Sequence, residues 1–279
     1  MKNLKVGLQL YSIRDAIAAD MDAAFKAVKE MGYDYVEWAG ATGGRTVQEV
    51  RELLDKHGLT CVSVHQPLAK FTADPVAAME FVKVLGAAYR AIPISARRQD
   101  SYLEEWDATM DLYGRIIDDS DKNGITQLYH NHDFEFSYAV DGEQIYDRMF
   151  SALPDTLQPE FDTAWVHYAG YDPAEYIRKF AGRVEVVHLK DFACAAFGNT
   201  PVWQWVAENG RENKPASLTD AGFSYQPVGY GMQNWASILT ACKDSGTEYV
   251  IVEQDSSPDR PSLESAAMSR AYLKENFGI

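Results

Sequence analysis

Four side chains of the kinds that bind divalent metal ions stand at the ends of short apolar runs in this sequence. His130, Asp162, His188 and Glu253 close the runs TQLYH, QPEFD, VEVVH and YVIVE. Each alone has a simpler explanation, because an aspartate after a strand often caps the next helix and a buried histidine often bonds the backbone. Together, imidazole and carboxylate donors suit Mn²⁺, Zn²⁺, Co²⁺ or Fe²⁺, and the carboxylates also tolerate Mg²⁺. We therefore expect these four residues to bind one divalent metal ion.

Further polar residues near these positions could use such an ion for proton transfer beside a carbonyl. A divalent ion polarises a carbonyl and an adjacent hydroxyl of a sugar-like ligand, and thereby acidifies the C–H between them. Glu253, His65 or His132 could take that proton, while Lys190 could stabilise the developing charge or simply pair with a neighbouring carboxylate. Return of the proton gives epimerisation or isomerisation, and expulsion of a hydroxyl or glycosyl group gives elimination.

The residues expected to contact the substrate are polar and aromatic side chains near the same strand ends. Gln9, Glu37 and Glu135 could hydrogen-bond sugar hydroxyls. Trp38 and Trp165 could pack on the apolar face of a sugar ring. The sequence offers few arginines near these positions and no glycine-rich helix start for a phosphate. A neutral sugar or keto-sugar is therefore the expected small-molecule partner.

The elements that must position these residues follow a regular alternation of strand and helix. Apolar, β-branched runs indicate strands at Lys5–Gln9, Tyr35–Trp38, Cys61–His65, Tyr89–Ile94, Thr126–His130, Gln158–Asp162, Val184–His188 and Tyr249–Glu253. Amphipathic stretches lie between them, and glycines at 32, 58, 86, 124, 182 and 246 supply left-handed helix ends. This order predicts an α/β fold with a parallel sheet.

Eight such units in 279 residues fit a single (β/α)₈ barrel domain spanning residues 1–279. The alternative, an open doubly wound sheet, would need a glycine-rich phosphate loop after the first strand, where the sequence reads QLYSIRD. Catalytic residues of a barrel lie at the C-terminal ends of its strands. The long, aromatic and apparently irregular segment Phe192–Gly231 follows the seventh strand and is expected to cover that rim.

Composition excludes several classes of partner. The net charge of −15 disfavours nucleic acid and anionic membranes. No segment reaches the roughly 18–20 apolar residues of a membrane span, and charged residues at 14 and 15 interrupt any signal-peptide core. Three widely spaced cysteines disfavour a disulfide framework. We expect a cytoplasmic protein, and a homo-oligomer is possible.

Several motifs resemble those of the xylose-isomerase-like TIM barrel superfamily, which includes ketose 3-epimerases, inosose dehydratases, endonuclease-four-type enzymes and many sugar phosphate isomerase/epimerase proteins. The motifs are SVH at Ser63–His65, HNH at His130–His132, DTAW at Asp162–Trp165, AGYDP at Ala169–Pro173, HLKD at His188–Asp191, PVGYG at Pro227–Gly231 and VEQD at Val252–Asp255. The resemblance covers nearly the whole chain. It implies a metal ion held by a carboxylate on the fifth strand and by Asp162, His188 and Glu253.

The chain departs from this family pattern at two positions. His130 stands where the family has a glutamate, so the implied ligand set becomes two histidines and two carboxylates. Ketose 3-epimerases use two metal-bound glutamates on opposite faces of the substrate, and here only Glu253 remains. Trp165 replaces a histidine that the three-metal cluster of the nuclease requires. The resemblance therefore implies a sugar enzyme with one metal ion and no nuclease activity.

Three functions remain open from the sequence. The first is a divalent-metal-dependent isomerase or epimerase that abstracts a proton beside the carbonyl of a ketose or keto-sugar. The second is a metal-dependent lyase that resembles inosose dehydratases or eliminates a group from a keto-glycoside. The histidine at position 130 favours the lyase, because elimination can use a single base and an acid. The third, a non-catalytic sugar-binding barrel, is disfavoured by the retention of Asp162, His188 and Glu253 together.

Overall fold

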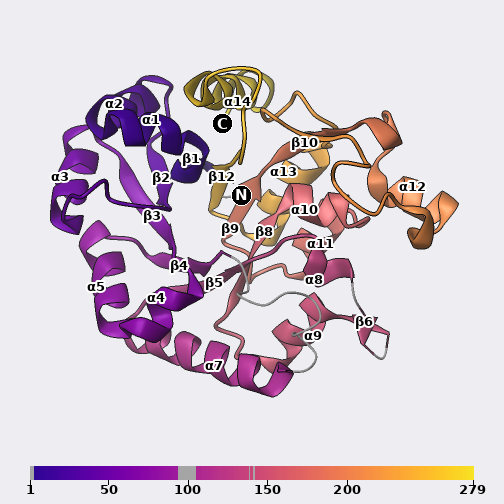
Figure 1. The fold of residues 1–279 in the computed structure, drawn as a ribbon, viewed down its shortest axis with the longest axis horizontal. Helices are drawn as coiled ribbons and strands as arrows, with labels where there is room; N and C mark the ends of the chain where they lie inside the picture. Colours follow the sequence, from indigo (N-terminus) through magenta and orange to yellow (C-terminus); the bar gives the residue numbers. More distant parts are fainter. Residues whose placement is uncertain (1–2, 94–104, 138, 141) are drawn as a thin grey trace.

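The computed structural model describes residues 3–93, 105–137, 139–140 and 142–279. Within them, eight parallel strands close into a barrel, and helices surround it (Figure 1). The strands are β1 (Lys5–Gln9), β2 (Tyr35–Trp38), β3 (Thr60–His65), β4 (Tyr89–Ile92), β5 (Thr126–His130), β8 (Gln158–Asp162), β9 (Val186–Leu189) and β12 (Tyr249–Val252). The predicted (β/α)₈ fold is confirmed. The predicted fourth strand ran to Ile94, which lies outside the described residues.

Eight helices in the described residues, one after each barrel strand, connect or follow the strands. They are α2 (Met21–Glu30), α3 (Val47–Lys56), α5 (Pro75–Leu85), α7 (Trp106–Lys122), α9 (Ile145–Ala152), α11 (Pro173–Lys179), α13 (Trp235–Ser245) and α14 (Ser262–Phe277). Side chains satisfy free amide groups at the starts of α2, α3, α5, α11 and α13, as where Thr46 and Glu49 form a reciprocal capping box at α3. Gly86 ends α5 with φ of +73°, as the sequence predicts.

Shorter elements extend the loops between strands and helices. The short helices are α1 (Arg14–Ala19), α4 (Leu68–Ala73), α8 (Phe134–Ser137), α10 (Thr163–Tyr168) and α12 (Val202–Asn209), with 3₁₀ turns at Leu10–Ile13, Ala195–Phe197 and Arg211–Asn213. Two antiparallel hairpins pair β6 (Ala139–Val140) with β7 (Glu143–Gln144), and β10 (Asp191–Cys194) with β11 (Phe223–Gln226). None of the described helices has both the length and the hydropathy needed to cross a membrane.

The barrel interior contains an apolar layer directly below the polar strand ends. This cluster is formed by Val62, Tyr89, Ala91, Leu128, Val186 and Ile251. Because strand side chains alternate between the two faces, the residue two positions after a member of this layer also points inward. Leu128, Val186 and Ile251 therefore lie one step below His130, His188 and Glu253. These polar side chains therefore lie directly above a buried apolar layer of the barrel.

The segment Phe192–Gly231 is more regular than the sequence suggested. It contains most of the β10–β11 hairpin and helix α12, so the expectation of an irregular stretch is wrong. Its Phe223 stacks on Trp165 of α10, with ring centroids 5.5 Å apart. Near the end of the segment, the backbone amides of Gly229 and Gly231 donate hydrogen bonds to Asp191, the residue that precedes the segment. The role of this segment as a cover for the rim stays a prediction.

Candidate metal centre

The four predicted ligands meet at the C-terminal rim of the barrel. Asp162 of β8 and His188 of β9 are register partners in neighbouring parallel strands. One donor atom each from His130, Asp162, His188 and Glu253 can be chosen so that all four atoms lie within 4.8 Å of one another. All four side chains are buried. We call this set the outer group, and the structure brings together every residue that the sequence predicted for it.

Local hydrogen bonds hold the outer group in place. Asp162 caps α10, since its Oδ1 accepts from the amides of Ala164 and Trp165. Its Oδ2 lies 3.6 Å from His130 Nε2, on the side of the other donors. Asn131 bridges the ends of β5 and β8, because its side-chain oxygen accepts from the amide of Asp162. The aspartate therefore serves as a helix cap and as a possible ligand at once.

A lysine ammonium lies between the two carboxylates of the outer group. Lys190 Nζ is 2.7 Å from Asp162 Oδ2 and 3.0 Å from Glu253 Oε2, and a third carboxylate, that of Asp255, lies 3.2 Å away. The side chain is 1% exposed. Burial alone would lower the pKa of Lys190, but Asp162, Asp255 and Glu253 outweigh it and raise the pKa well above its usual value. Lys190 is therefore a permanent cation at this position.

A second set of buried side chains lies against the same histidines. His65 Nε2 is 2.6 Å from Glu160 Oε2 and 3.1 Å from Glu37 Oε2. Together with Gln9, whose amide donates to Glu37 Oε2 over 2.7 Å, these residues form what we call the inner group. His65, His130, Glu160 and His188 also have one donor atom each within 4.8 Å of one another.

His130 and His188 of the outer group also contact the inner group, each through the opposite nitrogen of its ring. His188 Nδ1 faces Glu253 at 2.8 Å, while its Nε2 faces Glu37 at 2.6 Å. His130 Nε2 faces Asp162, while its Nδ1 lies 3.3 Å from Glu160 Oε2. Histidines that bind a metal through one nitrogen commonly donate the other N–H to a buried carboxylate, which fixes the tautomer and makes the ligand more basic. The inner carboxylates are placed for this role.

The donors fit a divalent ion. Two imidazoles and two carboxylates are a donor set that Zn²⁺, Mn²⁺, Co²⁺ and Fe²⁺ accept. Buried carboxylate oxygens normally have partners. In the described part of the chain, Glu37 Oε1 and Glu160 Oε1 are buried and make no hydrogen bond. Four buried carboxylates, those of Glu37, Glu160, Asp162 and Glu253, thus crowd around shared imidazoles. A bound cation would relieve this concentration of negative charge.

Burial and neighbouring charge change the acidity of these groups. Burial raises the pKa of Asp162 to about 6, although Lys190 opposes the shift. Burial and the Lys190 charge lower the pKa of His132 to about 3, so its imidazole is neutral at physiological pH. For Glu253 burial acts upward, but Lys190 and His188 outweigh it and lower the pKa. Glu253 and His132 are therefore both unprotonated at physiological pH.

The predicted substrate-contacting residues lie around the same centre. Trp38 and Trp165 are buried, and Trp165 lies with its ring centroid 5.8 Å from that of the half-buried His132. Glu135 is buried and accepts hydrogen bonds from the Tyr129 hydroxyl and the His132 amide. Gln9 belongs to the inner group. Contact of these four residues with a substrate stays a prediction.

Sequence reasoning missed Glu160 and undervalued Glu37. Glu160 lies two residues before Asp162 on β8, and the period of two in a strand places both on the inner face. This spacing was visible in QPEFD but was not used. The sequence presents Glu37 only as a partner for sugar hydroxyls. Its contact with His188 crosses the barrel interior from β2 to β9, which are separated by β1 and β12, and no local pattern reveals it.

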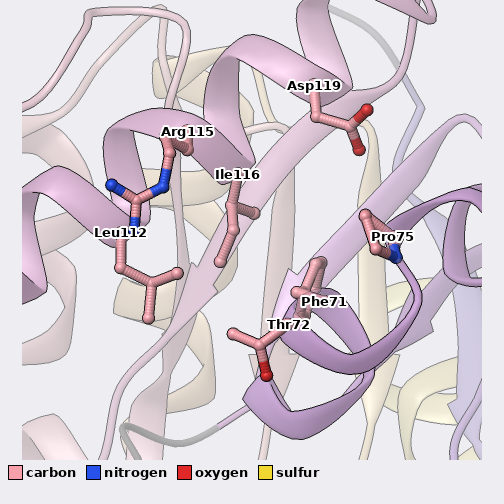
Figure 2. Close-up of a pocket in the computed structure, with 7 residues that line it drawn as sticks. All are labelled: Phe71, Thr72, Pro75, Leu112, Arg115, Ile116 and Asp119. Atoms are coloured by element: carbon pink, nitrogen blue, oxygen red, sulfur yellow. The ribbon is translucent and has the colours of Figure 1, made fainter.

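Two cavities differ in their relation to this centre. One, of about 810 Å³, is lined by residues after β2 and β3 and by α4 and α5, and it includes His65. The other, of about 450 Å³, lies between α4–α5 and α7 and includes no member of the inner or outer group. Figure 2 shows this second cavity, where Phe71 and Thr72 lie across from Leu112 and Ile116. Only the first of these two shares a residue with the candidate centre.

Comparison with known proteins matches most of the chain to one family of barrels. A sequence profile described as "Xylose isomerase-like TIM barrel" matches residues 25–275. An inosose dehydratase from Geobacillus thermodenitrificans is 28% identical over 182 residues, which cover 63% of this chain and 56% of that protein. The chain thus spans little more than half the length of this curated relative.

Solved structures show the same fold at low identity. A sugar phosphate isomerase/epimerase from Parabacteroides distasonis gives a TM-score of 0.76 at 19% identity, and the alignment covers 99% of this chain and 96% of that one. The IolI protein, solved with a bound zinc atom, gives a TM-score of 0.68 at 14% identity and covers 99% and 100% of the two chains. At these identities the likeness concerns the fold alone.

Proposed function

We propose, from the premise that this chain belongs to the xylose isomerase-like TIM barrel family, that it is a metal-dependent lyase acting on a keto-sugar. The observation that carries the proposal is the pairing of Glu253 with Lys190, whose Nζ lies 3.0 Å from Glu253 Oε2. A base and a cationic hydrogen-bond donor this close together act on the same face of a bound substrate. Elimination from one face needs this arrangement, whereas epimerisation needs proton transfer on two faces.

The outer group is the proposed metal site, with His130, Asp162, His188 and Glu253 as ligands. A divalent ion held there supplies Lewis acidity, which lowers the pKa of a C–H beside a substrate carbonyl. Glu37 accepts the Nε2–H of His188, and Glu160 Oε2 lies 3.3 Å from His130 Nδ1, so the two carboxylates favour ring orientations that present the opposite nitrogens to the ion. The zinc atom of the related IolI structure is consistent with this assignment.

The chemical step follows from the two residues of the pair. Glu253 takes the proton from the carbon beside the carbonyl, and the released electron pair forms the new C=C bond as the C–O bond to the leaving group breaks. Lys190 donates a hydrogen bond to the departing oxygen and stabilises its charge. The proton held by Glu253 passes to that oxygen, so water or an alcohol leaves and the carboxylate is restored. The inosose dehydratases among the relatives make a lyase outcome chemically consistent.

Isomerisation or epimerisation is the second candidate, and the position of His132 favours it. Glu253 follows β12 and His132 follows β5, so two unprotonated bases flank the intervening strands β9 and β8 that carry His188 and Asp162. Proton removal by one base and return by the other would invert a carbon centre. The neutral His132 replaces the second carboxylate of such a mechanism.

Incubation with a 3-keto-sugar or an inosose in deuterated water tests the two candidates. The metal-loaded protein should release water or alcohol and form an enone, and the Lys190→Met variant should lose this activity. Deuterium incorporation without loss of mass would replace the lyase proposal with the isomerase or epimerase. Absence of both reactions and of exchange would contradict catalysis on this class of substrate.

A further inference from the structure

We propose that the 810 Å³ cavity binds an aryl group carried by the keto-sugar substrate, so that the preferred substrates are aryl glycosides rather than free monosaccharides. The inference rests on the proposed function for the identity of the sugar part. The cavity itself is a separate structural feature, and its position, lining and size favour an aryl occupant.

The position of the cavity makes it an extension of the candidate centre. Its walls come from the ends of β2 and β3, on the rim where barrel active sites lie. His65 belongs both to the cavity wall and to the inner group, where its Nε2 lies 2.6 Å from Glu160. A substrate whose reactive carbons lie at the outer group can therefore direct a substituent past His65 into this space.

The lining of the cavity is apolar and contains an aromatic pair. Trp38 and Phe81 lie with ring centroids 6.2 Å apart at an angle of 57°. Val64, Pro67 and several alanines add further apolar surface. Such walls are the usual environment for a planar aromatic ligand.

Two polar side chains of the cavity wall make hydrogen bonds within the protein itself, although Gln66 Oε1 is buried without one. Asp74 caps α5 by accepting from the Ala77 amide, and the Gln66 amide donates to the Ala78 carbonyl. Lys70 is exposed, and its long side chain can keep the ammonium in water. A second sugar ring would lose hydrogen bonds to water without enough replacements, whereas an aryl ring needs none.

The size of the cavity also favours a substituent over a single small sugar. Pockets of roughly 300–1,000 Å³ are typical for drug-sized ligands, and this one lies near the upper end. Alanines at positions 73, 77 and 78 create the room where α4 and α5 face the strand ends. The small side chain of Ala77 is exposed, so a larger residue there fills the space without disturbing the core.

The test compares the binding of two unreactive probes, phenyl glucoside and methyl glucoside, by calorimetry or saturation-transfer NMR. Burial of the ring should make the wild-type protein bind the phenyl probe about tenfold or more tighter than the methyl probe. The Ala77→Trp variant should bring this ratio close to one. Val76→Trp is the matched control, because Val76 is the preceding residue of α5 and its side chain is 78% exposed and outside the cavity.

Equal binding of both probes by the wild type, or an unchanged ratio in Ala77→Trp, would overturn the inference. Failure of the proposed function is recognised separately, because neither probe contains a ketone and neither measurement depends on turnover. A retained phenyl preference in a protein that transforms no keto-sugar would remove the lyase proposal and leave the aryl site standing. Equal binding of both probes by a protein that still eliminates a group from a keto-sugar would remove the aryl site and leave the lyase proposal standing.

Discussion

The Glu37→Gln substitution should weaken metal binding although Glu37 is not a proposed ligand. Glu37 Oε2 faces His188 Nε2 at 2.6 Å, and it also accepts from the Gln9 amide at 2.7 Å. A neutral amide oxygen is a weaker acceptor than a carboxylate, so the His188 ring becomes less basic at Nδ1 and less firmly oriented. The removal of one buried negative charge near the ion acts in the same direction.

The expected magnitude follows from the geometry of the two imidazoles. Loss of a carboxylate behind a ligating histidine usually costs about 10–100-fold in metal affinity, or about 1.4–2.7 kcal/mol. Because the contact of Glu37 with His188 is short, the loss of metal affinity in Glu37→Gln should lie toward the upper end of this range. Glu160 Oε2 lies 3.3 Å from His130 Nδ1, so Glu160→Gln should lower the metal affinity by only about tenfold. Direct removal of a ligand, as in Asp162→Ala, should cost more than either and should reduce activity by orders of magnitude.

The assay is a competition titration of chelator-treated protein with Zn²⁺ or Co²⁺ and a chromophoric chelator. Glu135→Gln is the matched control, because Glu135 is a buried carboxyl that accepts hydrogen bonds from the Tyr129 hydroxyl and the His132 amide. Wild-type affinity in Glu37→Gln, or an equal loss in Glu135→Gln, would refute the reasoning. A larger loss in Glu37→Gln than in Asp162→Ala would instead place the ion in the inner group.

Three further predictions use the same centre. Lys190→Met should raise metal affinity in that titration, because it removes a competing cation from between two carboxylates, and should abolish turnover; lower affinity would contradict this account. His130→Glu should shift the metal preference toward Mg²⁺ or Mn²⁺, and it should lower the melting temperature of the metal-free protein, because the new carboxylate faces Glu160. An unchanged preference with a collapsed fold would mean that position 130 is not a ligand. Burial raises the pKa of Glu135 from 4.5 to about 7. The stabilising contribution of this carboxyl is therefore fully present below pH 4.5. As the pH rises through 7, the free energy of unfolding falls by up to about 3 kcal/mol. In urea unfolding, the stability of Glu135→Gln relative to the wild type should therefore be greater at pH 8 than at pH 5. A difference that does not change with pH would contradict this.

The sequence was sufficient to predict the barrel because its signals are local. Strand β1 was predicted with the bounds that the structure has, and α5 begins at Pro75 and ends before Gly86 as its sequence indicates. These features depend on residues a few positions apart, namely the alternation of apolar side chains, the caps and the left-handed glycine. The segment Phe192–Gly231 was misjudged because its helix and hairpin are short and are supported by packing against Trp165 rather than by periodicity.

The sequence predicted the residues of the site that stand as single polar side chains at the ends of apolar strands. His130, Asp162, His188 and Glu253 each stand at such an end, and parallel strands bring these ends to one rim. The inner group was harder, because Glu37 and Glu160 become partners of the histidines only when strands far apart in sequence close into a barrel. The position of the Lys190 ammonium between two carboxylates is likewise a property of the assembled rim.

Anomalous diffraction from a crystal of the metal-loaded protein tests the central claim most directly. Data on both sides of the zinc or cobalt absorption edge locate the ion and identify it at once. The account predicts one peak within bonding distance of Asp162, His188 and Glu253, with His130 as the fourth protein ligand. Absence of a peak, or a peak bound by Glu37, His65 and Glu160, would contradict it.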